Sequence, residues 1–294
     1  MSISNLAVII LTMNEERNLS YALDSVCGWA GEVHVLDSGS TDGTCALALA
    51  RGCVVTHHAF VSYPAQRNFA LRELPIAAEW VLFLDADEQV TPELRQEISR
   101  LLQTNPRENG FLIKYKLIWM GRWIRRGYYP VWLHRLIRRN EAYYPDRAIN
   151  EHVRVEGIIG KLRFDLIHED HKGIAVWIAR HNRYAELEAR EFLRMLVDPP
   201  PARFWNATQA ERTTWIRLHV WRRLPRLFRP FLYFFYRYFA RGGFLDGLPG
   251  FVYHFLHGLW YQFLIDLHCL DMEPSSCLKT GNPVEVAKRK GAGL

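Results

Sequence analysis

The sequence predicts an α/β fold in which a mostly parallel sheet is flanked by helices and followed by a helical extension. Three observations support this prediction. Residues 1–102 alternate short apolar runs with amphipathic segments, which is the pattern of a parallel sheet with helices on both faces. Polar residues directly follow three of these runs, where ligands bind in such sheets. Residues 215–270 have a helical pattern and are unusually aromatic.

The elements of the first hundred residues follow from hydrophobic periodicity. Residues 6–11 form a continuous apolar run, as a buried parallel strand should. We expect further short strands at residues 32–36, 54–56 and 80–84. Amphipathic segments indicate helices, which we expect at residues 14–26, 41–50, 64–74 and 91–102. Thr91 and Pro92 form the clearest start signal, because threonine is a good N-cap and proline suits the first turn.

The pattern changes after residue 110. Strands and loops rich in aromatic residues and arginine continue to about residue 170, and residues 173–196 form an amphipathic segment that ends before three prolines. A chain of 294 residues is long enough for one domain of ordinary size with an appendage. We therefore predict a first domain at residues 1–172, a helical extension at 173–278 and a loose basic tail at 279–294.

The charge of the chain is uneven. The formal net charge is +6, and the arginines gather in residues 122–139 and 212–241, whereas the first hundred residues carry many carboxylates. Such basic stretches favour nucleic acid, anionic lipid or a phosphorylated substrate as partner. The five cysteines form no C-x-x-C pair, so we expect reduced thiols in the cytoplasm rather than a disulfide framework or a zinc site. The first apolar run is too short for a secretory signal.

Polar clusters follow the first, second and fourth expected strands. Their members are Thr12, Asn14 and Glu15; residues 37–44; and residues 85–88. In the second cluster, small residues lead into a helix start, where backbone N–H groups can meet a polar or anionic ligand. Asp37 can accept a hydrogen bond from the N3–H of uracil or from a ribose hydroxyl. The alternative is a capped turn with Asp42 at the start of the helix.

The third cluster contains two carboxylates two residues apart. In an extended strand Asp85 and Asp87 would point to one side, and their mutual repulsion requires a cation or solvent. A hard divalent ion with oxygen ligands satisfies them and can bridge the phosphates of a nucleotide. The alternative is a solvated acidic turn that favours the dipole of the Thr91 helix.

Taken together, the motifs resemble glycosyltransferase family 2, the inverting enzymes of the GT-A type. The resemblance rests on the segments IILTMNEERNL, VLDSGSTDGT, AQRNFAL and VLFLDADE. Beyond residue 110 the chain is similar to the branch that adds glucose to the lipopolysaccharide core, in RLIRR, PDRAINEHV, LIHED, HNRYAELEAR and GGFLDGLPGF. The resemblance implies a GT-A fold and a nucleotide-sugar donor, and it covers nearly all of the chain except the basic tail.

The family also implies roles for individual residues. Thr12, Asn14, Glu15, Asp37 and Ser38 would hold the base and ribose, and Gln66, Arg67 and Asn68 would lie near the nucleotide or diphosphate. Asp85, Ala86 and Asp87 form the D-x-D motif, in which Asp85 mainly orients ribose or sugar and Asp87 ligates Mn²⁺ or Mg²⁺. His168 would complete the metal sphere, although a lone histidine is often structural.

Inverting transfer requires a carboxylate base on the acceptor side. The resembling branch implies Glu151 as this base, with Asp146 as the second candidate and a surface loop carboxylate as the alternative. The family often has His-Glu where this chain has Asn150 and Glu151, which leaves the role of position 150 open. Aromatic and basic residues of the following strands would form the acceptor wall by stacking on sugars and meeting phosphates. These are Trp119, Arg122, Trp123, Arg126, Arg135 and Arg138, and part of the aromatic residues in this region belong to the core.

The aromatic C-terminal region indicates contact with a membrane. A spanning helix needs about twenty apolar residues, and polar residues interrupt the stretch 244–270. We therefore expect helices that lie in the membrane interface, with arginines near anionic head groups. The alternatives are a helical cap over the first domain and a homo-oligomer contact.

The resemblance implies transfer of glucose from UDP-glucose to a heptose of the lipopolysaccharide inner core, at the cytoplasmic face of a bacterial inner membrane. A polyprenyl-linked or exopolysaccharide acceptor with another UDP-sugar is the alternative. A nucleic-acid-binding protein is disfavoured, since no RNP, KH or zinc motif is present and the acidic cluster repels phosphate unless it holds a metal ion. A sugar-1-phosphate nucleotidyltransferase would need a glycine-rich basic loop after the first strand, where this chain has Thr12 to Glu15. The intact D-x-D motif argues against a non-catalytic membrane scaffold.

Overall fold

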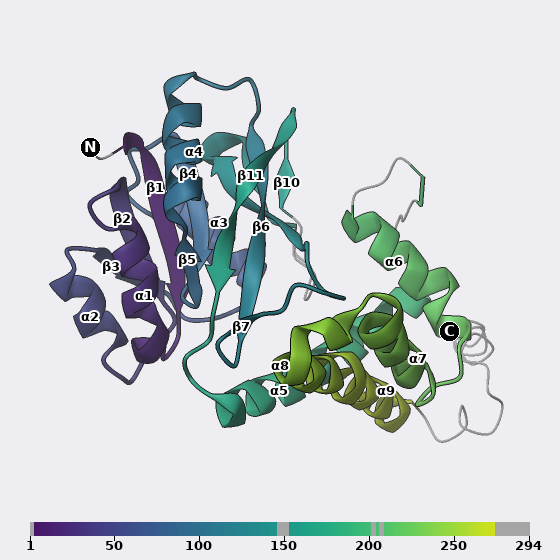
Figure 1. Ribbon diagram of the computed structural model, residues 1–294. Helices are drawn as coiled ribbons and strands as arrows, with labels where there is room; N and C mark the ends of the chain where they lie inside the picture. The colour runs from purple at the N-terminus through teal and green to yellow at the C-terminus, as the bar shows by residue number, and fades with distance from the viewer. Residues whose placement is uncertain (1–2, 146–152, 201–203, 206–208, 274–294) are drawn as a thin grey trace. The chain divides into compact units, whose positions relative to one another are not determined.

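The computed structural model describes residues 3–145, 153–200, 204–205 and 209–273 (Figure 1). Asp146 and Glu151 lie outside these described residues. The chain divides into two compact units, Met1–Gly173 and Ile174–Leu294. We describe each unit by itself.

The first unit is built on a nine-stranded mixed sheet with the order β3-β2-β1-β4-β8-β6-β11-β5. Its strands are β1 (Ile3–Thr12), β2 (Ala30–Asp37), β3 (Val54–His57), β4 (Trp80–Asp85), β5 (Glu88–Val90), β6 (Gly110–Trp119), β8 (Trp132–Arg138) and β11 (Ile159–His168), with β7 (Arg122–Trp123) paired to β6. The four strands predicted in the first hundred residues are present and pair in parallel. β8 and β5 run antiparallel to their neighbours, so the sheet is mostly parallel. β9 (Ala142–Tyr143) and β10 (Arg154–Val155) form a separate pair.

Four helices accompany this sheet: α1 (Glu16–Val26), α2 (Thr44–Ala50), α3 (Tyr63–Glu73) and α4 (Pro92–Gln103). The predicted start of α4 is confirmed, because the Thr91 hydroxyl accepts a hydrogen bond from the Leu94 N–H at 3.3 Å. Two predicted starts are wrong by two or three residues. Asn14 has a φ of 56°, a left-handed conformation that excludes it from α1. Residues 38–43 are held in a loop, so α2 begins at Thr44.

Both faces of the sheet are buried, as the continuous apolar runs predict. In β1, Leu6, Val8 and Ile10 belong to the core on the side of α1 and α4, whereas Ala7 and Ile9 belong to the core on the side of α3. This alternation follows from the two-residue period of a strand. The packing fixes the strand ends rigidly.

The strand directions bring the ends of six strands to one edge of the sheet. β1, β2, β3, β4, β6 and β11 all run in the same direction. Their last residues, Thr12, Asp37, His57, Asp85, Trp119 and His168, therefore lie along the same edge. This carboxyl edge is where ligands bind in sheets of this kind.

The second unit is helical. It contains α5 (Ile174–Val197), α6 (Gln209–His219), α7 (Arg229–Phe235), α8 (Gly247–Tyr253) and α9 (Tyr261–Met272). Short 3₁₀ segments, η2 (Trp221–Arg223) and η4 (Gly243–Asp246), and wider π-helical segments, η3 (Tyr236–Ala240) and η5 (His254–Trp260), connect them. Phe192 on α5 and Ile265 on α9 lie in the shared core of these two helices.

The arginines of this unit do not all lie where the sequence suggests. Arg229 is buried and donates to Asp266, which is buried as well. Arg237 is also buried and lies 3.1 Å from the Nδ1 of His257. These two arginines therefore do not reach outward to head groups as expected. Within the described residues, no helix is both long enough and apolar enough to cross a membrane.

Candidate functional site

Asp37, the last residue of β2, organises the loop that follows it. Its carboxylate is fully buried and accepts hydrogen bonds from the Thr12 hydroxyl at 2.9 Å and from the backbone N–H groups of Gly39 and Ser40 at 2.9 and 2.8 Å. Burial raises the pKa of Asp37, but the hydrogen bonds from Ser40, Thr12 and Gly39 outweigh it and lower the pKa overall. Asp37 thus holds residues 38–40 in place as an ionised group.

The loops after β1 and β2 are tied together. The backbone N–H of Asn14 donates to the Ser40 hydroxyl at 2.7 Å, and the Asn14 side-chain oxygen accepts from the Thr41 N–H at 2.8 Å. The left-handed backbone of Asn14 makes this two-way contact feasible. Gly39 has a φ of 98°, which a residue with a Cβ adopts only with strain. The first two polar clusters of the sequence therefore form one surface.

Glu15 lies deeper in the same region. Its carboxylate accepts from Asn18 at 2.9 Å and is paired with Lys172. Burial is the largest influence and raises the pKa of Glu15, and the negative charge of Asp87 acts in the same direction. Asp87 is thus near enough to Glu15 for their charges to interact, which connects the first and third clusters.

Asp85, at the end of β4, is neutralised by arginine. Arg135 on β8 donates through Nη1 to Asp85 at 3.2 Å and through Nη2 to Glu88 at 2.6 Å, and Nη2 also pairs with Asp85. Arg67 on α3 lies 3.5 Å from Asp85. Glu88 also accepts from the Asp85 backbone N–H at 3.0 Å. The first aspartate of the D-x-D motif, whose side chain is 38% exposed, is therefore held by the buried Arg135 in a charge cluster with Glu88.

The charge cluster separates the pKa values of its two carboxyl groups. Burial acts on Asp85, but Arg135 and Arg67 overcome it and lower the pKa to about 2. Burial dominates at Glu88, and with the charge of Asp85 it raises the pKa to about 7 despite Arg135. Arg135 thus stabilises Asp85 as a carboxylate, whereas Glu88 holds a proton up to near neutral pH.

Asp87 faces a different partner. The chain turns at Ala86 and Asp87 between β4 and β5, so the expectation that both aspartates share one extended strand is wrong. Asp87 Oδ1 lies 3.5 Å from Nδ1 of His168, the last residue of β11. The Asp87 carbonyl also accepts from the Glu169 N–H at 2.9 Å. The fold therefore brings the predicted metal ligands Asp87 and His168 together and holds Asp85 against arginine.

The pair of Asp87 and His168 fits a divalent cation. Oxygen ligands bind Mg²⁺ at about 2.0–2.1 Å, so two ligands of one ion lie roughly 3 Å apart or slightly more. The His168 side chain is 26% exposed and Asp87 12%, so both side chains are partly accessible to solvent. A second group, Asp37, Cys45 and His57, has ligand atoms within 4.8 Å of one another. It fits less well, because the Asp37 oxygens already accept hydrogen bonds from their own loop.

Two residues of the AQRNFAL segment act within the protein. The Gln66 amide donates to the Ser38 hydroxyl and to the carbonyls of His58 and Ala59, at 3.0–3.1 Å. Asn68 exchanges two hydrogen bonds with the backbone of Tyr144, at 2.7 and 2.9 Å. Of the three residues assigned to the nucleotide side, Arg67 is the one that contacts the D-x-D motif.

The predicted acceptor residues do not all lie at the carboxyl edge. Trp119, Arg122 and Trp123 form the β6–β7 hairpin there, and Arg126 follows it and is exposed. The cations of Lys116 and Arg125 lie over the Trp123 ring, with Lys116 Nζ 5.1 Å and Arg125 Cζ 5.3 Å from the ring centroid. Arg135 is buried in the charge cluster instead.

Arg138 lies at the opposite edge, because it pairs with Trp80 at the start of β4. Its guanidinium lies over the Trp80 ring and is paired with Glu79. Arg138 is therefore not brought together with the other predicted acceptor residues.

Sequence reasoning missed two members of the site, Glu88 and Lys172. Glu88 follows the D-x-D motif directly, yet its burial depends on β11, with which β5 pairs. No sequence signal links Lys172 to Glu15.

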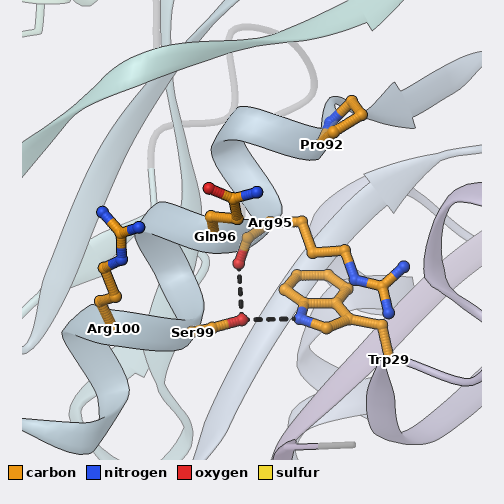
Figure 2. Close-up of a pocket in the computed structure, with 6 residues that line it drawn as sticks. All are labelled: Trp29, Pro92, Arg95, Gln96, Ser99 and Arg100. Carbon is orange, nitrogen blue, oxygen red and sulfur yellow. Dashed lines mark hydrogen bonds between the residues drawn. The ribbon is translucent and has the colours of Figure 1, made fainter. Parts of the chain in front are cut away.

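A surface pocket elsewhere in the unit takes no part in this site. Figure 2 shows Trp29 against α4, with its indole N–H donating to the Ser99 hydroxyl at 3.0 Å and Arg95 beside the ring. Trp29 directly precedes β2 and contacts the first residue of β1. The pocket thus lies at the amino end of these strands, away from the carboxyl edge.

Comparison with known proteins gives consistent matches. The family model described as Glycosyl transferase family 2 matches residues 7–166. The chain is similar to the lipopolysaccharide core biosynthesis glycosyltransferase LpsC of Rhizobium meliloti (strain 1021), with 27% identity over 271 residues, 88% of this chain and 89% of that protein. It is also similar to an uncharacterized glycosyltransferase of Rickettsia typhi, with 26% identity over 257 residues, 83% of this chain and 82% of that protein.

Solved structures match as well, two of them from S. aureus and Mycobacterium tuberculosis. S. aureus TarS (residues 1–349) gives a TM-score of 0.45 at 16% identity, over 96% of this chain and 92% of that chain. Glucosyl-3-phosphoglycerate synthase of Mycobacterium tuberculosis, in complex with Mn²⁺, UDP and glucosyl-3-phosphoglycerate, gives a TM-score of 0.32 at 26% identity, over 38% of this chain and 43% of that chain.

Proposed function

The chain belongs to glycosyltransferase family 2 and is a glycosyltransferase, and on this premise we propose that it transfers a hexose from a UDP-sugar to a lipid-linked saccharide with inversion. The donor we propose is UDP-glucose, and the acceptor is the lipopolysaccharide inner core. The similarity to LpsC, whose name places it in lipopolysaccharide core biosynthesis, supports this acceptor. The observation that carries the proposal is the pairing of Asp87 with His168 at the same sheet edge as the Asp37 loop.

The nucleotide occupies the surface formed by the loops after β1 and β2. Asp37, Thr12 and Asn14 hold these loops rigid through the hydrogen bonds described above. Ser38 and Glu15 lie on the same loops, so base and ribose meet preorganised polar groups. Such preorganisation reduces the entropy lost when the donor binds.

Asp87 and His168 would hold a divalent cation, Mn²⁺ or Mg²⁺. When bound, this ion neutralises the diphosphate that leaves the anomeric carbon. Asp85 stays ionised beside Arg135 and Arg67 and can accept hydrogen bonds from a ribose or sugar hydroxyl. The two aspartates of the motif thus divide orientation and charge neutralisation between them.

The acceptor approaches along the β6–β7 hairpin. Trp123, with Lys116 and Arg125 beside its ring, offers an aromatic face for a sugar and positive charge for phosphate. Glu151 removes the proton from the attacking hydroxyl, with Asp146 as the second candidate for this role. The enzyme works at the cytoplasmic face of the inner membrane, where a lipid-linked acceptor is presented. A polyprenyl-linked or exopolysaccharide acceptor with another UDP-sugar is the second candidate function.

A donor panel tests the proposal. The purified chain is incubated with nucleotide sugars and Mn²⁺, with and without heptose-containing core acceptor, and nucleoside diphosphate release is measured. We expect acceptor-dependent release with UDP-glucose that chelator abolishes. Release from a different donor, or release unaffected by chelator, would contradict the proposed donor or the proposed metal dependence.

A further inference from the structure

The second unit contains a helical hairpin in which most charged side chains are buried and many large apolar side chains are exposed. This is the reverse of the usual arrangement in a water-soluble protein. One arm is formed by α7 and η3 (residues 229–240), and the other by α8 and η5 (residues 247–260). η4 connects the arms at the tip. The ring centroids of Phe234 on the first arm and Phe251 on the second lie 6.5 Å apart, and the ring centroid of Tyr238 lies 5.7 Å from that of Phe251.

Glycine makes this hairpin tight. A Cβ at Gly243 would lie 2.5 Å from the His254 ring, and one at Gly250 would lie 2.7 Å from the Gly243 carbonyl. The tip therefore packs directly onto the second arm. The hairpin is a defined structural element and not a loose loop.

Three of the four charged side chains of residues 228–255 point inward. Arg229, Arg237 and Asp246 are buried, and Arg229 is held by Asp266 of α9. Arg241 is the exposed charge of this fully described stretch. Its guanidinium donates at 3.3 Å to the hydroxyl of Tyr236, which lies further from the tip along the first arm.

Large apolar side chains of the same stretch point outward. The exposed ones nearest the tip are Phe235, Phe239, Phe244, Leu245, Leu248 and Phe251. Leu245 and Leu248 are 55% and 67% exposed. A soluble surface seldom presents so many contiguous large apolar groups with so little charge. Polar groups inside and apolar groups outside are the arrangement that a hydrocarbon solvent favours.

The opposite end of the hairpin is cationic. The Trp221 carbonyl accepts from Arg229, the first residue of α7, at 3.0 Å, which places η2 at the base of the first arm. Arg222 and Arg223 of η2 are exposed. Cations at this level match the phosphates of anionic lipids.

We infer that residues 228–255 insert as a re-entrant hairpin into one leaflet of an anionic bilayer, with η4 deepest and η2 at the head groups. The first arm of residues 229–240 is about 18 Å long at 1.5 Å per residue, against roughly 30 Å for the hydrocarbon core. The tip therefore reaches the middle of the bilayer and does not cross it. This inference deepens the proposed function, on which it rests for the lipid-linked acceptor.

Vesicle flotation of the full chain, without donor or acceptor, tests the inference. We expect the chain to float with phosphatidylglycerol vesicles and to bind neutral phosphatidylcholine vesicles more weakly. The double variant Leu245→Glu/Leu248→Glu should reduce the bound fraction by roughly tenfold or more, because two carboxylates would enter hydrocarbon. Leu187→Glu, on an exposed position of α5, is the matched control and should bind like the parent chain.

Two further measurements keep the outcomes distinct. UDP-glucose-dependent diphosphate release by the double variant in detergent solution should equal that of the parent chain, so loss of flotation is separated from loss of folding or of the proposed activity. Phe244→Trp should gain fluorescence that lipids brominated near the chain end quench more strongly than lipids brominated near the head group. Unchanged flotation of the double variant would overturn the inference. So would an oligomer that the double variant dissociates while vesicle binding persists, because the face would then join two copies.

Discussion

Asp87 and His168 face each other across the carboxyl edge of the sheet, with 3.5 Å between Oδ1 and Nδ1. The sheet fixes this distance, because His168 pairs in register with Glu88, the neighbour of Asp87. The Glu169 N–H adds a hydrogen bond to the Asp87 carbonyl. The turn at Asp87 and the end of β11 are thus held together, so that the two proposed metal ligands face each other.

Replacing Asp87 tests this arrangement. Asp87→Ala should abolish metal-dependent transfer, and His168→Ala should weaken Mn²⁺ binding by about 10- to 100-fold, the scale of losing support at a metal site. Mn²⁺ binding by electron paramagnetic resonance and diphosphate release measure the two effects. Asp24→Asn, on the exposed face of α1, is the control and should leave both unchanged. Full Mn²⁺ affinity in both site variants would contradict the assignment.

Arg135 should matter mainly for folding stability. It is buried between Asp85 and Glu88, so Arg135→Met leaves the buried Glu88 without a counter-charge, which costs about 3–5 kcal/mol, while Arg67 still pairs with the partly exposed Asp85. Denaturant unfolding measures the loss. Adding Glu88→Gln should recover part of it, since one unpaired carboxylate is removed. Arg51→Met, which breaks an exposed pair with Asp24, should have little effect.

Glu88 should make stability depend on pH. Its pKa is raised to about 7 from an ordinary value near 4.5, so the folded state binds the proton more tightly than the unfolded state does. The free energy of unfolding should therefore fall as pH rises from about 4.5 to about 7, by on the order of 2–3 kcal/mol. Asp85 acts in the opposite sense, but only between about pH 2 and its ordinary value near 3.8.

Unfolding in metal-free buffer at pH 5 and pH 8 measures this dependence. Glu88→Gln should flatten it, whereas Glu93→Gln, at an exposed position of α4, should retain it. An equal slope in the parent chain and in Glu88→Gln would assign the dependence to another group.

A variant of Asn68 tests whether this residue supports the fold or binds the donor. Its side chain exchanges two hydrogen bonds with the Tyr144 backbone, so Asn68→Ala should destabilise the fold by about 1–3 kcal/mol. The affinity for UDP, measured by calorimetry well below the unfolding temperature, should stay the same. A large loss of UDP affinity without a loss of stability would restore the role that the family resemblance implied.

Glu151 is the test of the proposed base. Glu151→Gln should keep UDP-sugar binding and lose transfer by about 100-fold or more, the typical contribution of general base catalysis. Donor affinity and single-turnover transfer are the two measurements. Asp146→Asn is the comparison, and if it alone loses transfer, the base is Asp146.

Local chemistry explains what the sequence predicted well. Strands β1 and β4 follow from unbroken apolar runs, and the start of α4 follows from Thr91 and Pro92. The clustering of Thr12, Asp37 and Asp85 at one edge follows because parallel strands end together. These features depend on a few consecutive residues and on the direction of the chain, both of which the sequence contains.

The sequence by itself therefore determined the α/β architecture, the start of α4 and the edge at which polar residues gather. Tertiary structure alone decided the partners at that edge: Arg135 for Asp85 and His168 for Asp87. It also decided that Arg229 is buried while Leu248 is exposed. The physical reason is that side-chain pairing depends on the register of strands and helices distant in sequence, which packing of the whole unit sets.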